Sequence, residues 1–137
     1  MIVIDTHALV WAVSDDEQLG PAARETITAS ATAGGVLVSA ITPWEIAMLV
    51  QKDRLALGRD LAAWIDAALA LPGIVLAAIA PAIAIDSVRL PGQFHADPAD
   101  RLIVATARHH GGTLLTADHA ILAYGAAGHV RVADART

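Results

Sequence analysis

The sequence contains no cysteine among its 137 residues, and it has few aromatic and few basic side chains. Without cysteine, the chain has no disulfide framework, no thiolate nucleophile and no thiolate zinc site. Lys52 is the only lysine, and no glycine-rich loop leads into it. The composition therefore excludes cysteine catalysis and a nucleotide triphosphatase of the P-loop type.

The charge balance is acidic, with 14 Asp and Glu against 9 Lys and Arg and a formal net charge of -5. This balance argues against a protein that binds nucleic acid mainly through a basic surface. A phosphate contact remains open, because a divalent cation held by carboxylates reverses the sign of the local field. The apolar content of 55% in so short a chain predicts that an oligomer or a partner covers part of the surface.

Long apolar runs are also missing. Glycine and proline interrupt the two longest uncharged stretches, residues 26–44 and 67–85, so neither spans a bilayer as an unbroken helix. The first residues lack a basic region, and Asp5 interrupts their apolar run, unlike a secretory signal. We therefore expect a cytoplasmic protein that does not cross a membrane.

Glycine and proline divide the rest of the chain into short β-branched runs and longer alanine-rich segments of helical period. We expect strands at residues 2–4, 36–39, 74–77, 113–115 and 129–132. We expect helices at residues 6–13, 21–33, 43–52, 61–70, 81–87, 98–110 and 118–124. Strands that are apolar on both faces fit a parallel sheet covered by helices. The sequence predicts one α/β domain over residues 1–137, a three-layer α/β/α sandwich with a mostly parallel sheet of about five strands.

Four acidic residues occupy related positions in this pattern. Asp5 follows the first predicted strand and Asp118 the fourth, whereas Glu45 and Asp100 lie in the first turns of two helices. In an open parallel sheet, the loops that leave the carboxyl ends of the strands line one ligand-binding crevice. Gathered carboxylates repel one another unless they are protonated or bridged by a cation. The pattern therefore predicts a metal site.

Each acid also has a structural interpretation as a helix cap. Thr42 and Asp97 each precede a proline and have an acid three residues further on, which is typical of an N-cap. Capping explains Asp97 best. It does not explain why several acids fall on one predicted edge of the sheet.

The available ligands indicate which metal such a site would bind. Carboxylate oxygens without thiolates suit Mg²⁺ or Mn²⁺ rather than zinc. The six histidines show no zinc-binding spacing, and we interpret them as surface residues or as neighbours of the ligands. Mg²⁺ takes phosphate oxygens of a substrate as further ligands, which favours phosphodiester or phosphoryl chemistry.

Four segments, residues 2–11, 39–46, 95–107 and 114–118, resemble in order the motifs of the PIN domain. More narrowly, they resemble the VapC-type toxins of type II toxin–antitoxin systems. The resemblance implies a PIN-like fold and a Mg²⁺- or Mn²⁺-dependent endoribonuclease that cleaves RNA phosphodiester bonds with activated water. It also implies a cognate VapB-type antitoxin that inhibits the activity, and a homodimer.

The acidic positions of that family fall on the four acids already isolated. The resemblance makes Asp5 the central metal ligand, Glu45 and Asp100 direct or water-mediated ligands, and Asp118 the ligand of a second or weaker position. Supporting roles fall on three further residues, namely Thr116 beside the first aspartate, Thr6 near a metal-bound water, and Asp97.

Contacts to RNA and to the antitoxin are less visible in the sequence. Arg101 and Arg108 are the candidate RNA contacts. Trp64 is expected in the core, whereas Trp11 and Trp44 are candidates for an antitoxin groove. All three tryptophans lie in segments predicted to be helical.

Two other functions stay open at this point. In a phosphatase or phosphoacceptor domain of doubly wound type, Asp5 would be phosphorylated, but such domains normally pair the site with a lysine, and Lys52 follows the wrong element. In a non-catalytic interaction module the acidic rim would be helix capping or a degenerate metal site. A rise in melting temperature with Mg²⁺ or Mn²⁺ separates a true metal site from these alternatives.

Overall fold

The computed structural model describes residues 1–137, which form a five-stranded sheet and seven helices. The strands are β1 (Ile2–Ile4), β2 (Val36–Ser39), β3 (Ile74–Ala77), β4 (Thr113–Thr116) and β5 (Val132–Asp134). The helices are α1 (Thr6–Val13), α2 (Pro21–Thr32), α3 (Thr42–Gln51), α4 (Leu61–Leu69), α5 (Pro81–Val88), α6 (Pro98–His110) and α7 (His119–Ala126). All seven predicted helices are present, and their ends lie within two residues of the predicted ends.

The sheet is entirely parallel, with the strand order β3-β2-β1-β4-β5. This confirms the predicted α/β class. The chain first runs outward from β1 to β2 and β3, and then crosses to the other side of β1 to form β4 and β5. The carboxyl ends of β1 and β4 are therefore neighbours at the point where the direction of winding reverses, which is where open α/β sheets bind ligands.

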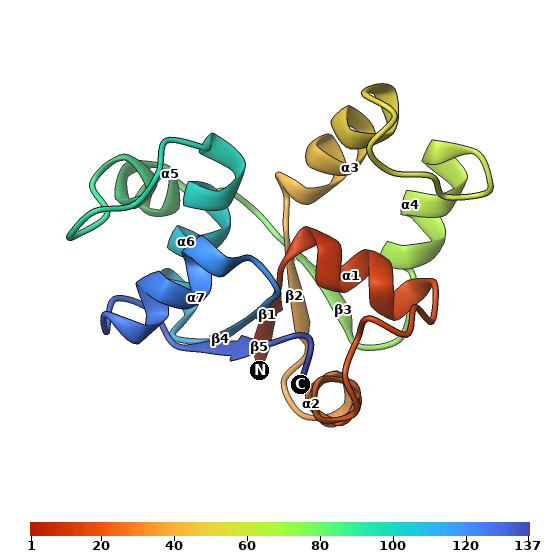
Figure 1. The fold of residues 1–137 in the computed structure, drawn as a ribbon, viewed down its shortest axis with the longest axis horizontal. Coiled ribbons are helices and arrows are strands. Elements are labelled where there is room, and N and C mark those ends of the chain that lie inside the picture. Colours follow the sequence, from red (N-terminus) through yellow and green to blue (C-terminus); the bar gives the residue numbers. More distant parts are fainter.

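Helices cover the sheet on both sides (Figure 1). Alternate residues of β1 point to opposite faces, as the strand pleat requires. Ile2 and Ile4 belong to a core with residues of α1, α2, α3 and α4, whereas Val3 belongs to a second core with residues of α6 and α7. The result is the predicted three-layer α/β/α sandwich.

The predicted position of the last strand is wrong. The prediction placed it at residues 129–132, whereas β5 is Val132–Asp134. The apolar residue Val130 packs instead into the core beside α6 and α7, and Val132, Ala133 and Asp134 form the pairs with β4. A run of apolar residues near a strand start does not reveal which residue enters the ladder first.

Aspartates begin several of the helices. Asp5, Asp60, Asp97 and Asp118 are the N-caps of α1, α4, α6 and α7, and each side chain accepts a bond from a backbone N–H of its helix. Thr42 is not the predicted N-cap, because α3 already begins at Thr42. Its buried hydroxyl lies 3.2 Å from the hydroxyl of Thr6, so it joins the starts of α3 and α1 instead of capping a helix.

One strand departs from the expectation that helices cover both faces. In the edge strand β3, Val75 and Leu76 are 46% and 51% exposed. Ile85 and Val88 of α5 and Trp44 of α3 are also exposed. None of the seven helices has the length and apolar character needed to cross a membrane.

The turn into β3 gives a test of the fold. Gly73 has a φ of +83°, and a Cβ there would lie 2.5 Å from the carbonyl oxygen of Ala31. Gly58 has a φ of +73° with no atom within 4 Å of such a Cβ. We expect Gly58→Ala to lower the free energy of unfolding by about 1 kcal/mol through its backbone conformation alone. Gly73→Ala should cost ~3 kcal/mol or more, because it adds a clash with backbone.

Urea unfolding of the two variants beside the wild type measures both losses. Equal losses for the two variants would contradict the packing of α2 against this turn.

Candidate metal centre

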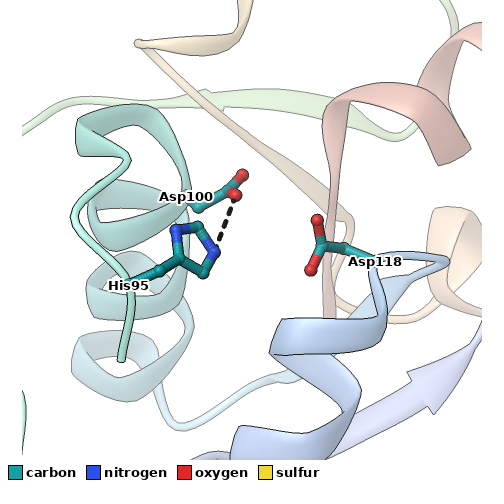
Figure 2. Close-up of side chains that lie close together, drawn as sticks. All are labelled: His95, Asp100 and Asp118. Carbon is teal, nitrogen blue, oxygen red and sulfur yellow. Dashed lines mark ion pairs between the residues drawn. The ribbon is translucent and has the colours of Figure 1, made fainter. Parts of the chain in front are cut away.

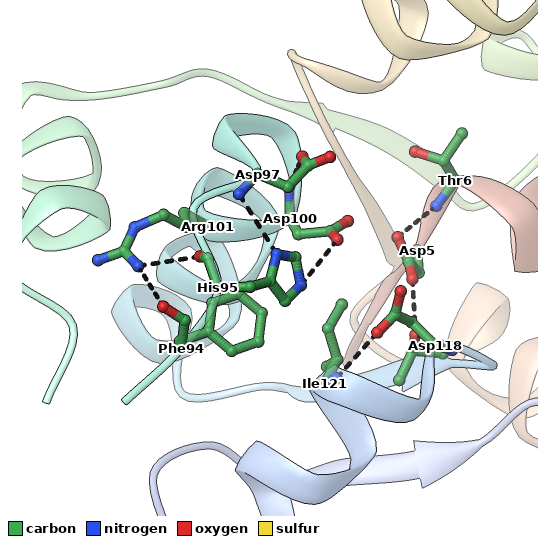
Figure 3. Close-up of polar contacts among 10 residues, drawn as sticks. Asp5, Thr6, Phe94, His95, Asp97, Asp100, Arg101, Asp118 and Ile121 are labelled. Carbon is green, nitrogen blue, oxygen red and sulfur yellow. Dashed lines mark hydrogen bonds and ion pairs between the residues drawn. The ribbon is translucent and has the colours of Figure 1, made fainter. Parts of the chain in front are cut away.

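Five carboxylates gather at the carboxyl edge of the sheet, where the winding of the chain reverses. Asp5 directly follows β1, and Asp118 lies two residues beyond β4. Glu45 comes from the first turn of α3, whereas Asp97 and Asp100 come from the start of α6. Figure 3 shows that Asp97 and Asp100 face Asp5 and Asp118 across the end of the sheet.

Asp5 is held on both of its carboxylate oxygens. Oδ1 accepts the Thr6 backbone N–H at 2.8 Å, and Oδ2 accepts the Thr116 hydroxyl at 2.6 Å. The Thr116 hydroxyl oxygen in turn accepts the Asp118 backbone N–H at 3.0 Å. Burial raises the pKa of Asp5, and the bonds from Thr116 and Thr6 oppose that rise. A chain of hydrogen bonds thus connects the ends of β1 and β4.

Glu45, Asp97 and Asp100 form one group of converging carboxylates. One oxygen of each lies within 4.8 Å of the others. Glu45 is only 9% exposed, and its buried Oε1 has no hydrogen-bond partner. Burial raises the pKa of Glu45, while the Thr6 hydroxyl opposes the rise. A buried carboxylate oxygen without a partner is costly, and a cation in this group would satisfy it.

His95, Asp100 and Asp118 form a second group, again with ligand atoms within 4.8 Å of one another (Figure 2). The Nε2 atom of His95 lies 3.2 Å from Oδ2 of Asp100. The Asp97 backbone N–H donates to Nδ1 of His95 at 3.3 Å. Because Nδ1 accepts this bond, the ring hydrogen of His95 lies on Nε2, which faces Asp100. Asp100 belongs to both groups.

The environment of Asp100 is unusual for a carboxylate. Burial, followed by the charges of Asp5, Asp97, Asp118 and Glu45, raises the pKa of Asp100 from 3.8 to about 8. Like charges at short distance disfavour ionisation in the same direction as desolvation. Without a cation, this carboxyl group therefore holds a proton at neutral pH.

The donor set fits a hard divalent cation. It consists of carboxylate oxygens, one of them buried and unpartnered, and one imidazole nitrogen, and it offers no sulfur ligand. Mg²⁺ and Mn²⁺ prefer such oxygen ligands and commonly retain water. Asp5 belongs to neither group of three, although its negative charge raises the pKa of both Glu45 and Asp100.

Two aspartates predicted from the sequence each cap a helix and also belong to a group of possible metal ligands. Asp97 caps α6 through Oδ1, which accepts the Asp100 backbone N–H at 3.1 Å, and it also belongs to the first carboxylate group. Asp118 likewise caps α7 by accepting the Ile121 N–H at 3.0 Å. Capping and convergence thus occur together, so one interpretation does not exclude the other.

The two arginines predicted to contact RNA make internal contacts instead. Arg101 donates to the carbonyl oxygens of Ser87, Phe94 and His95. Arg108 pairs with Asp86 at 2.9 Å and donates to the carbonyl of His129. These bonds stabilise the segment before α6 and the residues that precede β5. The predicted substrate-binding role of the two arginines gains no support from them.

His95 is the site residue that sequence reasoning missed. Its ring packs against Phe94 with 4.3 Å between centroids, and Arg101 holds its carbonyl oxygen (Figure 3). The residue lies in an irregular segment, where no periodicity shows which way a side chain points. The available signals were its position at the start of the motif segment 95–107 and two residues before the helix cap Asp97.

The family model of the PIN domain matches residues 2–126. The chain belongs to the PIN-domain family. It is 33% identical over 117 residues to Ribonuclease VapC22 of Mycobacterium tuberculosis, a match covering 85% of this chain and 86% of that protein.

Solved structures share the fold. VapBC2 from Rickettsia felis bound to a promoter DNA fragment matches with a TM-score of 0.71 and 16% identity, over 98% of each chain. DNA-bound VapBC from Salmonella typhimurium matches with a TM-score of 0.69 and 14% identity, also over 98% of each chain.

The raised pKa of Asp100 predicts how stability depends on pH. Between pH 3.8 and about 8 the folded chain keeps a proton that the unfolded chain has released. Folding stability of the metal-free protein therefore falls as the pH rises through this window. We expect the melting temperature in EDTA to be ~3 °C or more lower at pH 8 than at pH 5.5. Differential scanning calorimetry measures the shift.

The Asp100→Asn variant serves as the control, because its side chain does not ionise and its melting temperature should depend less on pH. An equal pH dependence of the melting temperature in the wild type and in Asp100→Asn would contradict the assignment of this dependence to Asp100.

Proposed function

We propose that this PIN-domain protein is the endoribonuclease toxin of a type II toxin–antitoxin pair, and that it uses Mg²⁺ or Mn²⁺. The observation that carries the proposal is the convergence of Glu45, Asp97 and Asp100 around a buried carboxylate oxygen that has no partner. The likeness to Ribonuclease VapC22 supports RNA as the substrate. We treat residues 1–137 as one catalytic domain.

In this proposal, Glu45, Asp100 and Asp118 bind the metal together with Asp5, as the resemblance to the family implies. Asp97 adds a further carboxylate to the first group. When bound, the ion supplies positive charge that lowers the pKa of water and neutralises the phosphate in the transition state. The protein supplies no nucleophile of its own.

The threonines orient the acids. The Thr116 hydroxyl fixes Oδ2 of Asp5, which keeps the rotation of that carboxylate constant. Thr6 contributes its backbone N–H to the other oxygen, while its hydroxyl faces Thr42 and lowers the pKa of Glu45. Both contacts favour ionised carboxylates, which is the form that binds a cation.

His95 acts as a positioning residue for Asp100. The Asp97 N–H and the Phe94 ring fix the imidazole, so that the Nε2 hydrogen points toward Oδ2 of Asp100. A donor on one carboxylate oxygen leaves the other oxygen for the metal. Outer partners of this kind orient metal ligands and raise metal affinity.

An antitoxin partner follows from the same assignment. The structures that share this fold include DNA-bound VapBC2 and FitAB and a toxin–antitoxin complex from Klebsiella pneumoniae. We propose that a VapB-type antitoxin and a second copy of this chain cover exposed apolar residues such as Trp44, Leu76 and Val88. Trp11, predicted as an antitoxin contact, is only 8% exposed, and Trp64 lies in the core as predicted.

The ribonuclease proposal is tested by incubating purified, antitoxin-free protein with total RNA and Mn²⁺ or Mg²⁺. We expect discrete products with the wild type and none with EDTA. Asp5→Asn should lower the cleavage rate at least about 100-fold, because it removes one charge and disturbs the bond from Thr116. Denaturing gels with end-labelled RNA measure the rate.

Asp66→Asn is the matched control, since Asp66 is exposed on α4 and makes the same change of charge. Absence of metal-dependent cleavage of any RNA would favour a non-catalytic interaction module with a degenerate acidic site. Wild-type cleavage by Asp5→Asn would remove Asp5 from the catalytic set.

The role of His95 gives a separate prediction that does not depend on RNA. His95→Ala should weaken Mn²⁺ binding about 10-fold, because Asp100 loses the donor that orients it. His95→Gln, which can place an amide N–H near Asp100, should recover part of the affinity. Isothermal titration calorimetry with MnCl₂ measures both dissociation constants.

His110→Ala is the control, because His110 is exposed at the other end of α6. Unchanged Mn²⁺ affinity in His95→Ala would show that the imidazole does not position the ligand.

A further inference from the structure

A cavity of about 280 Å³ is lined by Asp5 and Asp118 and by no residue of α6. Its lining brings opposite charges together. His7, His119 and Arg136 share it with the two aspartates, and Trp11 forms part of its wall. The proposed mechanism uses only the two carboxylates of this cavity. The basic side chains opposite them have no role in it.

Arg136 is fixed in this cavity by contacts at several points. The residue follows β5, and its backbone N–H donates to the Asp134 carboxylate at 2.9 Å. Its Nη1 donates to the carbonyl oxygen of Ala117 at 2.6 Å. The guanidinium carbon lies 5.4 Å from the centroid of the Trp11 ring, which is a cation–π arrangement. The head of a long and flexible side chain is thereby placed next to Asp118.

The guanidinium has no acidic partner. The ion pairs of the structure involve Arg24, His95 and Arg108, and none includes Arg136. Arginine has five N–H donors in a planar fork that matches phosphate geometry, and only Nη1 has an acceptor here. Arg136 shares the cavity with two carboxylates and pairs with neither, so it still has N–H donors for an anion.

We infer that this cavity binds a phosphate group of the RNA strand adjacent to the bond that is cut, and that Arg136 is its main ligand. The inference rests on the proposed ribonuclease function. The carboxylates and their cation would take the phosphate that reacts, and Arg136 would take a neighbouring phosphate of the same strand. Charge-assisted and bidentate bonds from arginine suit that contact. His7 and His119 add ring N–H donors at the rim.

This assignment accounts for how a chain of net charge -5 binds a polyanion. A broad basic surface is absent, and Arg101 and Arg108 are engaged with the protein itself. A single well-placed guanidinium next to the metal site attracts the strand locally. It would also give the strand a direction relative to the reacting phosphate, because Arg136 lines a cavity that includes none of Glu45, Asp97 and Asp100.

The same segment provides a matched control. Arg131 precedes β5, whereas Arg136 follows it, so the two residues lie toward opposite edges of the sheet. Arg131 donates to the carbonyl oxygen of Gly111 at the end of α6, far along the strand direction from the acids. Arg131→Gln and Arg136→Gln remove the same charge from these two places.

The test measures RNA binding separately from cleavage. A fluorescein-labelled single-stranded RNA is titrated with each protein in EDTA at several salt concentrations, and fluorescence anisotropy gives the affinity. Arg136→Gln should lower the affinity about 10-fold and reduce the slope of log K against log salt by about 0.7, the value for one phosphate contact on a single strand. Arg136→Lys should retain the slope but recover only part of the affinity. Arg131→Gln should match the wild type.

Cleavage of the same RNA with Mn²⁺ adds a second readout. Arg136→Gln should raise KM with a smaller change in kcat, since the residue does not touch the reacting phosphate. Should Arg136→Gln fail to fold by circular dichroism, Arg136→Met keeps an aliphatic stem over Trp11 and carries the same expectation.

An unchanged affinity and salt slope in Arg136→Gln would overturn this inference, and wild-type cleavage would then leave the ribonuclease proposal intact. A second outcome is a smaller salt slope in Arg136→Gln together with no RNA cleavage by any of the proteins. It would support the phosphate site and overturn the ribonuclease.

Discussion

Electrostatic repulsion among carboxylates at one edge of the sheet is the constraint on which the site depends. Five acids from four parts of the chain meet where β1 and β4 end, and one of them, Asp100, has its pKa raised to about 8. The fold tolerates this arrangement because helix N-termini stabilise negative charge and because threonine hydroxyls and backbone N–H groups occupy several oxygens. The buried Oε1 of Glu45 has no hydrogen-bond partner, and a cation bound beside it would satisfy this oxygen.

The sheet and the acids could be predicted from the sequence, because both follow from local patterns. Short β-branched runs predicted the strands, and Asp5 and Asp118 were placed correctly because Asp5 directly follows one strand and Asp118 lies two residues beyond another. The start of β5 was predicted wrongly, because Val130 fits a core position as well as a strand. His95 and Arg136 were missed for a different reason. They lie outside regular elements, where their positions depend on contacts with distant residues such as Phe94 and Ala117.

Helix capping and the proposed metal site use the same aspartates. Asp97 and Asp118 each give one oxygen to a helix N-terminus and belong to a ligand group as well. The bond to the helix fixes the rotamer, so the carboxylate is already oriented when a cation arrives. A capping motif in the sequence is therefore compatible with a catalytic role and does not count against it.

The bond between Asp5 and Thr116 joins residues that are 111 positions apart. A growing chain on the ribosome has its first aspartate long before the strand that completes the pocket has been made. Until β4 pairs with β1, Asp5 lacks the hydroxyl that orients it, and Asp118 and Arg136 are still to come. On the proposed function, a chain that ends before β4 would lack the bond that orients Asp5, so we expect RNA cleavage only from chains in which β4 has been made and has paired with β1.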